Sequence, residues 1–363
     1  MGFARLVARG SVGVIAISFL AGALAPTFAR AQAQLDDTPE AFGQALRAWA
    51  EKNNVTRAIV VVRRNGKIVY KSKIGGADPD AAYHLFSLSK AITAACIATL
   101  IRDGMLTFET TLATGLAKFF KMNGRPADPR IEGVTVAQLL THRAGFSGNR
   151  DKNDAVTGTN LTSYLQESSA REVPRPALLA RAFQMKLLRA PGTEFVYGNT
   201  AYLALGTVIE ELTDKPYDSY CRDAVLKPVG VSGELEPTWR VMSSFGGWRM
   251  KGADYLSFLD YFDPVDQRLG KTAKAWMLSD ATKEGGSHGA WYALGTNVRK
   301  YGNGVNVWHW GSWRQSGAVT FAARWYDGTA WFVAASPHLP EGDPRLELDR
   351  ALVHAYRAVR RWD

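Results

Sequence analysis

The segment from Phe86 to Arg102 constrains the fold more than any other part of the sequence. Its pattern predicts a helix that is rich in alanine and apolar on nearly all sides, ended by Asp103-Gly104. A helix that is apolar all round has to be buried, because it keeps no polar face for water. We therefore expect this helix at the centre of a helical layer.

Strand-like segments lie at both ends of the chain. Two β-branched runs, at 58–63 and 67–71, are joined by Asn65-Gly66, which is typical of a β-hairpin. Three more runs follow at 305–310, 318–325 and 330–335, with Asp327-Gly328 as the turn between the last two. An amphipathic helix is expected at 38–53, and a final helix from Asp343-Pro344, an N-cap followed by a first-turn proline, to about 360.

These elements predict one antiparallel sheet that is built from both ends of the chain. The expected fold class is α/β (α+β), with a mostly helical domain inserted into the sheet domain. The expected boundaries are 35–85 and 285–363 for the α/β sheet domain and 86–284 for the helical domain. Further helices in the insertion are expected at 134–142, 202–212 and 218–226.

Residues 1–31 are typical of a secretory signal peptide. Arg5 and Arg9 precede an apolar run at 12–24, and Ala29-Arg30-Ala31 is a cleavage signature. We expect cleavage near Ala31 or at Ala33, a periplasmic or secreted location and no stable membrane span afterwards. An uncleaved anchor is the alternative.

The charge distribution argues against a nucleic-acid partner. The formal net charge is +10, and the three arginines of residues 1–31 account for three of these charges, which leaves +7. The basic residues are spread along the chain and form no basic helix face with interleaved aromatic side chains. A solvated basic surface is the simpler interpretation.

The two cysteines, Cys96 and Cys221, each lie in an apolar helical stretch, far apart in the sequence. They can pair in an oxidising compartment, but the pattern favours buried free thiols. No C-x-x-C or H-E-x-x-H occurs, and the six histidines are scattered. We therefore expect no metal and no other cofactor.

Ser87 and Lys90 are the first candidate catalytic pair. A spacing of three residues places them on one helical face, close enough to hydrogen-bond. A lysine in an apolar setting loses its proton more easily, and a serine nucleophile needs such a base. An N-cap serine followed by a solvated lysine is the alternative. Ser89 is the rival hydroxyl, but adjacent helical positions do not face each other, so the spacing favours Ser87.

Tyr197 and Asn199 form the second candidate group. Two residues apart in an extended or turn segment, they point the same way and can present a phenol and an amide to one cavity. A turn with a packing tyrosine explains the same pattern.

The third group is Trp308-His309-Trp310-Gly311-Ser312, on an expected strand. A glycine there allows a substrate or another backbone to approach, and the N–H of Ser312 can serve as an oxyanion donor. An aromatic strand with a bulge is the alternative.

In this order, the three groups resemble the motifs S-x-x-K, Y-x-N and H-x-G of the serine β-lactamase and penicillin-binding-protein superfamily. The segments 138–146 and 191–202 are also similar to family sequences, and the resemblance covers roughly residues 40 to 360. It is strongest to the branch with class C β-lactamases, D-aminopeptidases, DD-peptidases and related esterases.

The resemblance implies a role for each residue. Ser87 would be the nucleophile, Lys90 its base or base partner, and Tyr197 the group that takes and returns the leaving-group proton. Asn199 would bind Lys90 or the substrate amide, and the N–H groups of Ser87 and Ser312 would form the oxyanion hole. Which of Lys90 and Tyr197 is the general base stays open.

His309 stands where β-lactamases and transpeptidases usually carry a lysine. A largely neutral histidine attracts a substrate carboxylate more weakly, unless Arg314 compensates. Trp308, Trp310 and Trp313 can line an apolar cleft, whereas His142 is expected to be structural.

We therefore expect a serine hydrolase that acts through an acyl-enzyme on a small ester, amide or D-amino-acid peptide. A class C-like β-lactamase or DD-carboxypeptidase, and a non-catalytic module that binds penicillin or peptidoglycan, are the alternatives.

Overall fold

The computed structural model describes residues 35–148, 156, 160–161, 163–164, 174–279, 289–313, 317–336 and 343–363. The expected signal peptide with its cleavage site, and Arg314, lie outside these residues.

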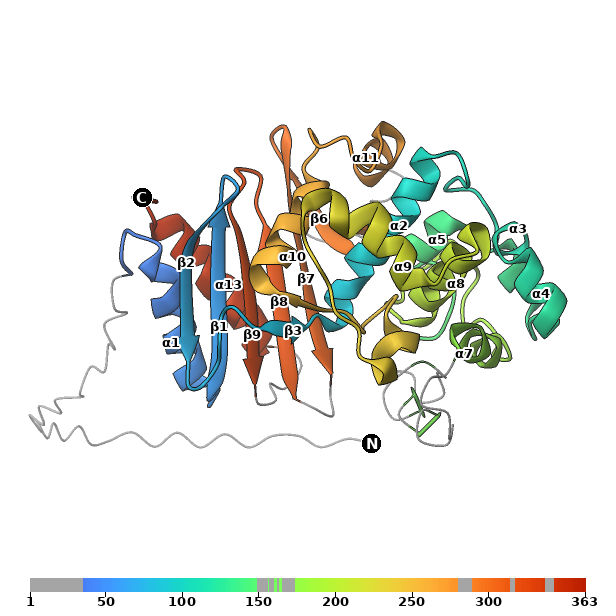
Figure 1. The fold of residues 1–363 in the computed structure, drawn as a ribbon, viewed down its shortest axis with the longest axis horizontal. Helices are drawn as coiled ribbons and strands as arrows, with labels where there is room; N and C mark the ends of the chain where they lie inside the picture. The colour runs from blue at the N-terminus through green and yellow to red at the C-terminus, as the bar shows by residue number, and fades with distance from the viewer. Residues whose placement is uncertain are drawn as a thin grey trace, which may run out of the picture. The chain divides into compact units, whose positions relative to one another are not determined.

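A seven-stranded antiparallel sheet has the order β2-β1-β9-β8-β7-β6-β5 (Figure 1). The strands are β1 (Arg57–Arg64), β2 (Lys67–Ile74), β5 (Trp291–Ala293), β6 (Thr296–Tyr301), β7 (Gly304–Trp313), β8 (Ala318–Arg324) and β9 (Ala330–Ser336). The prediction of one antiparallel sheet from both ends of the chain is confirmed, because β1 pairs with β9.

The sequence did not reveal four of the strands. β5 and β6 extend the sheet beyond β7, and β3 (Ala82–His84) pairs with β4 (Arg249–Lys251) in a separate two-stranded sheet. β3, β4 and β5 have three residues each, and β6 ends in three exposed residues, Arg299-Lys300-Tyr301. Such short or polar segments carry little of the alternating pattern by which strands are recognised.

Both faces of the sheet are buried. In β1, Ile59 and Val61 pack into the core beneath the helical part of the chain. Val60 and Val62 pack on the other face, against α1 (Glu40–Lys52) and α13 (Asp343–Ala358), which lie together in Figure 1. This explains why β1 is a continuous apolar run rather than an alternating one.

The other helices lie between β2 and β5 in the sequence. The α-helices are α2 (Ser89–Arg102), α3 (Leu112–Gly115), α4 (Ala117–Asn123), α5 (Val136–Leu140), α7 (Arg175–Ala182), α8 (Thr200–Thr213), α9 (Tyr217–Cys221), α10 (Gly252–Phe258) and α11 (Lys271–Met277). The short turns are η1 (Phe86–Leu88), η2 (Pro129–Gly133), η3 (Arg222–Leu226), η4 (Lys227–Val229), η5 (Pro237–Met242) and η6 (Leu259–Phe262).

α2 is buried along almost its whole length, from Ser89 to Ile101, as its composition predicts. The α-helix begins two residues after Ser87, which lies in the preceding 3₁₀ turn η1. The helix expected at 134–142 is shorter, because His142 takes a left-handed conformation with φ of 55° that ends it. The helix expected at 218–226 is α9 continued by the π-turn η3.

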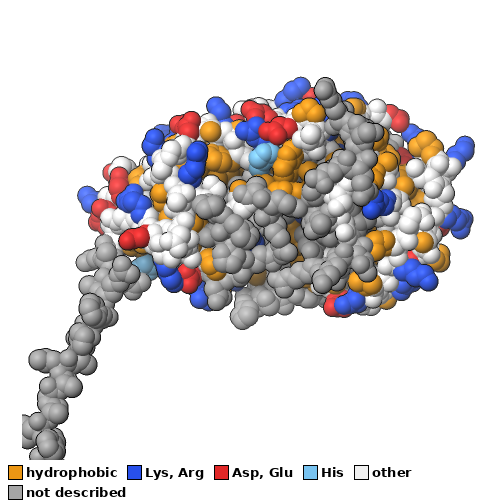
Figure 2. Space-filling model, turned by 90° about the horizontal axis from the view of Figure 1, so that it is seen from below, with side chains coloured by type: hydrophobic (Ala, Val, Ile, Leu, Met, Phe, Trp, Pro, Cys, Tyr) orange, Lys and Arg blue, Asp and Glu red, His pale blue; other side chains and the backbone are white. Residues whose placement is uncertain are grey.

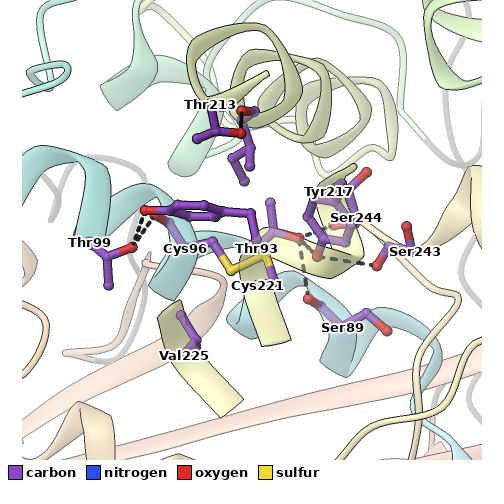
Figure 3. The surroundings of a disulfide bond; sticks show 12 residues. Ser89, Thr93, Cys96, Thr99, Thr213, Tyr217, Cys221, Val225, Ser243 and Ser244 are labelled. Carbon is purple, nitrogen blue, oxygen red and sulfur yellow. Dashed lines mark hydrogen bonds between the residues drawn. A yellow bond between two sulfur atoms is a disulfide. The ribbon is translucent and has the colours of Figure 1, made fainter. Parts of the chain in front are cut away.

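The prediction of free thiols is wrong, because Cys96 and Cys221 form a disulfide (Figure 3). The two residues are 125 positions apart in sequence, but α2 and α9 pack side by side. Sequence distance says nothing of this proximity, which only the packing of the helical layer creates.

Residues Leu35–Asp363 form one compact unit, and the expected division into two domains stays a prediction. On the face drawn in Figure 2, basic and acidic side chains are interspersed and form no single basic patch. Within the described ranges, no helix has the length and apolar character needed to cross a membrane.

Candidate active site

Ser87 lies in a strained turn that neighbouring elements hold in place. The preceding residue, Phe86, has a positive φ of 48°. Such a backbone costs on the order of 1 to 3 kcal/mol for a residue other than glycine, so tertiary contacts have to fix it. Leu85 supplies two of them: its N–H donates to Trp248 O (2.8 Å), and its carbonyl accepts from Thr320 Oγ1 (3.0 Å).

Gly311 on β7 allows this turn to pack against the sheet. A Cβ at this position would lie 2.3 Å from Leu85 O and 3.0 Å from Phe86 Cβ. The close approach expected at this glycine is therefore made by backbone, and Gly311 lies beneath the Ser87 turn rather than among the residues that line the cavity described below.

Lys90 connects Ser87 to two carbonyl groups. Its Nζ lies 3.2 Å from Ser87 Oγ, 2.8 Å from Asn199 Oδ1 and 3.1 Å from Phe245 O. The side chain is fully buried, and burial penalises the ammonium form. The pKa of Lys90 is therefore held well below its ordinary value of 10.5.

The partners of Lys90 direct its lone pair at Ser87. A neutral amine has two N–H donors and one lone pair. The carbonyl oxygens of Asn199 and Phe245 can only accept, so they take both donors. Ser87 is the one partner of the three with a proton to give. The geometry thus suits removal of the Ser87 proton by the Lys90 amine.

The Asn199 amide has a defined orientation, because its Nδ2 donates to Val156 O (3.2 Å) and leaves Oδ1 for Lys90. Asn199 immediately precedes α8, and the rigid start of this helix holds it. The structure therefore brings Ser87, Lys90 and Asn199 together, as the motif spacing predicts.

Tyr197 lies beside the same group. The Lys90 Nζ is 4.9 Å from the centre of the Tyr197 ring. Burial raises the pKa of the Tyr197 phenol far above 10, and the nearby Ser87 hydroxyl only partly opposes this effect. Within the described part of the chain, the phenol oxygen makes no hydrogen bond of good geometry. Tyr197 is thus a neutral phenol with a proton to donate.

His309 is a buried, neutral histidine. Its Nδ1 donates to Trp310 O (2.6 Å), because a carbonyl only accepts, and its Nε2 then accepts from the Tyr292 hydroxyl (3.1 Å). Burial, together with the neighbouring Lys90, lowers the pKa of His309 to about 3. His309 therefore supplies no positive charge at neutral pH.

The N–H of Ser312 points to an open edge of β7. Trp308 O accepts from Asn297 Nδ2 on β6, and the pairing of β6 with β7 ends at this residue. Alternate residues of a strand direct their N–H and C=O groups to the same edge, so Trp310 and Ser312 share the edge of Trp308. Ser312 and Ser87 both line one cavity, and the family resemblance assigns their N–H groups to the oxyanion hole.

This cavity has a volume of about 750 Å³, and its wall combines aromatic with polar and charged side chains. Its aromatic lining includes Phe86, Phe195, Trp239, Tyr292, Trp310 and Trp313. The Trp239 and Trp313 rings meet edge to face, with 5.2 Å between their centres. Of the three tryptophans considered from the sequence, Trp308 lies outside the cavity, beneath the Arg299 guanidinium.

His142 has a structural position, as expected. Its ring packs 4.4 Å from that of Tyr197, and its Nδ1 accepts from the Gly198 N–H (3.4 Å). Ser89, the rival hydroxyl, is fully buried and accepts from the Trp248 N–H (3.3 Å). Neither residue lines the cavity.

Sequence reasoning missed two groups of the site. Tyr292 is in a three-residue strand with no recognisable motif, and the Phe245 carbonyl is backbone, which any residue type supplies. Among the described residues, no cluster of three or more His, Cys, Asp or Glu side chains is placed to hold a metal ion.

A family model described as Beta-lactamase matches residues 42–355. Protein flp of Staphylococcus aureus (strain MW2) is 28% identical over 187 residues, which are 49% of this chain and 34% of flp. The putative penicillin-binding protein PbpX of Bacillus subtilis (strain 168) is 26% identical over 225 residues, 58% of this chain and 49% of PbpX. The chain thus spans less than half the length of either relative.

Among solved structures, a D-stereospecific amidohydrolase from Streptomyces sp. has a similar fold. The TM-score is 0.68 at 20% identity, over 88% of this chain and 98% of that one.

Proposed function

We propose that this chain, which belongs to the Beta-lactamase family, is a serine hydrolase that forms an acyl-enzyme at Ser87 with an ester, an amide or a D-amino-acid peptide and then hydrolyses it. The observation that carries this proposal is the hydrogen-bond set of Lys90, whose two acceptor-only carbonyls leave the lone pair for the Ser87 proton. A purely binding module has no use for such an arrangement.

In the proposed acylation, Lys90 takes the proton from Ser87 as Oγ bonds to the substrate carbonyl carbon. The N–H groups of Ser87 and Ser312 bind the oxyanion that forms. As the bond to the leaving group breaks, the Tyr197 phenol protonates that group, and the proton held by Lys90 restores the phenol. In deacylation, water attacks the acyl carbon and gives its proton to Tyr197. Tyr197 passes a proton to Lys90, Lys90 returns one to Ser87 Oγ, and the acid is released.

Two observations favour a substrate without a carboxylate. His309 is neutral, and Arg189, one of the two arginines among the described cavity residues, is paired with Glu194 at 2.5 Å. The aromatic wall suits an apolar or aromatic group. The likeness to a D-stereospecific amidohydrolase brings amides of D-amino acids into the proposal. We also propose a periplasmic or secreted location, on the signal-peptide pattern of residues 1–31.

A substrate panel tests this proposal. We expect wild-type protein to hydrolyse short-chain p-nitrophenyl esters or D-aminoacyl p-nitroanilides faster than nitrocefin, whose carboxylate finds no cation at His309. Ser87→Ala should remove all of this activity. Hydrolysis that persists in Ser87→Ala, or nitrocefin as the best substrate of the wild type, would contradict the proposal.

The pH dependence of kcat/KM provides a second test. Lys90 has to be neutral to act as a base, so activity should rise with pH through its pKa, well below 10.5. His309, with a pKa of about 3, should not titrate between about pH 5 and 9. The same rising limb is therefore expected in His309→Asn, measured with a p-nitrophenyl ester. Loss of the rising limb in His309→Asn would show that His309, and not Lys90, is the titrating group.

A further inference from the structure

The carbonyl of Phe245 needs support of its own, because it lies in an irregular segment between η5 and β4. This segment turns around Met242, whose carbonyl accepts from the N–H groups of Phe245 (2.9 Å), Gly246 (2.7 Å) and Gly247 (3.0 Å). A turn held only by itself would leave the position of Phe245 O free to vary relative to Lys90. Other elements have to fix it.

Part of this support comes from α2 itself. Thr93, one turn after Lys90, donates from Oγ1 to Ser244 O (2.7 Å). The Thr93 hydroxyl also contacts the Tyr217 hydroxyl at 2.6 Å. Figure 3 shows Thr93, Tyr217, Ser243 and Ser244 gathered beside the Cys96–Cys221 disulfide, which ties α2 to the helix that carries Tyr217.

The rest of the support comes from Arg175, at the start of α7. Its Nη1 donates to Ser244 Oγ (2.8 Å) and its Nη2 to Ser243 Oγ (2.7 Å), so one rigid guanidinium binds both serine hydroxyls. Arg175 is 5% exposed and lies 3.3 Å from Glu210 Oε1, with its guanidinium 4.6 Å from the centre of the Tyr217 ring. A buried charge with this many partners is fixed in place.

α8 leaves room for this contact at Gly206. A Cβ there would lie 2.6 Å from Ser244 Cβ and 2.9 Å from Arg175 Nη1. Glycine in a helix interior is less favourable than alanine, so its presence here calls for a packing reason. The space that it provides is what allows Arg175 and Ser244 to meet beside α8.

We propose, building on the function proposed above, that Arg175 is a positioning residue for catalysis: it holds the Ser243–Phe245 turn so that the Phe245 carbonyl keeps the Lys90 lone pair directed at Ser87. Arg175 itself lies outside the cavity and touches neither Ser87 nor substrate. Its effect on the reaction passes entirely through Lys90, and this distinguishes it from a residue that only stabilises the fold.

A double-mutant cycle between Arg175 and Lys90 tests the proposal. The measurement is the rate of Ser87 labelling by a fluorophosphonate, at a temperature where thermal melts show every variant folded. Arg175→Met should slow labelling by about 10- to 100-fold when Lys90 is present, since small displacements of catalytic groups have effects of this size. In a Lys90→Ala background, the same substitution should change the rate less than about twofold, because coupled residues are not additive.

Two further variants make the cycle decisive. Gly206→Ala keeps every polar group but places a methyl group against Ser244. Like Arg175→Met, it should slow labelling when Lys90 is present and have little effect in the Lys90→Ala background. Arg181→Met removes an exposed arginine from the same helix and should leave the rate unchanged in both backgrounds.

The outcomes are distinct. Equal rate losses in the two Lys90 backgrounds, or no loss in either, would overturn the positioning role while leaving the proposed function intact. Absence of Ser87 labelling in the wild type would instead overturn the proposed function.

Discussion

Replacing Lys90 with alanine is expected to slow acylation of Ser87 by about 100- to 10,000-fold, the range typical of a lost general base. The substitution removes the amine that lies 3.2 Å from Ser87 Oγ and that we propose as the acceptor of its proton. It also leaves Asn199 Oδ1 and Phe245 O without the donor that they share. Stopped-flow or discontinuous labelling with a fluorophosphonate gives the rate directly.

Lys274 supplies a matched control for this prediction. It is also a buried lysine, and it donates to the backbone carbonyls of Tyr261 and Asp263, away from the cavity. Lys274→Ala should lower the melting temperature, because it leaves those carbonyls unpaired, and should leave acylation of the folded protein unchanged. Equal losses of acylation in the two variants would mean that Lys90 matters only for folding.

Of the proposed substitutions, removal of the Cys96–Cys221 disulfide should lower the free energy of unfolding the most. The bridge joins α2 to α9 across 125 residues, and native disulfides of this kind contribute about 2 to 5 kcal/mol to the free energy of unfolding. We expect Cys96→Ala/Cys221→Ala to unfold at a lower denaturant concentration than the oxidised wild type. Equilibrium unfolding in urea, followed by tryptophan fluorescence, measures the difference.

The chemically reduced wild type is the control for this variant. It carries the same residues as the oxidised protein but lacks the bridge, so its unfolding midpoint should fall to about that of the double variant. Coincident unfolding curves for the oxidised, reduced and alanine forms would contradict a stabilising role for the disulfide.

The sequence predicts those parts of the fold that local patterns encode. The apolar character of α2 on all sides, and the Asn65-Gly66 hairpin, each lead to an element at nearly its observed position. β5 and β6 escaped prediction, because they form by pairing with a neighbouring strand, β5 with β6 and β6 with β7, rather than through a pattern of their own. The Cys96–Cys221 pair escaped for the same reason, since helix packing alone brings the cysteines together.

The residues of the site also fall into those that the sequence predicts and those that only the structure reveals. Ser87, Lys90, Tyr197 and Asn199 have side-chain chemistry that a motif can reveal, and the structure brings them to one place. Phe245 O and the Arg175 contacts arise from backbone and tertiary geometry, so no sequence pattern marks them. Each motif taken alone also had a purely structural interpretation. Only the proximity of the motifs in the structure favours the catalytic one.

Peptide mapping of the covalent adduct tests the central claim most directly. Tryptic cleavage after Lys73 and Lys90 releases the peptide 74–90, which contains both Ser87 and Ser89. After labelling with a fluorophosphonate, tandem mass spectrometry of this peptide should place the adduct on Ser87, and the Ser87→Ala protein should give only unmodified peptide. An adduct on Ser89, or an unmodified peptide from wild-type protein under the same conditions, would contradict the claim that Ser87 is the nucleophile.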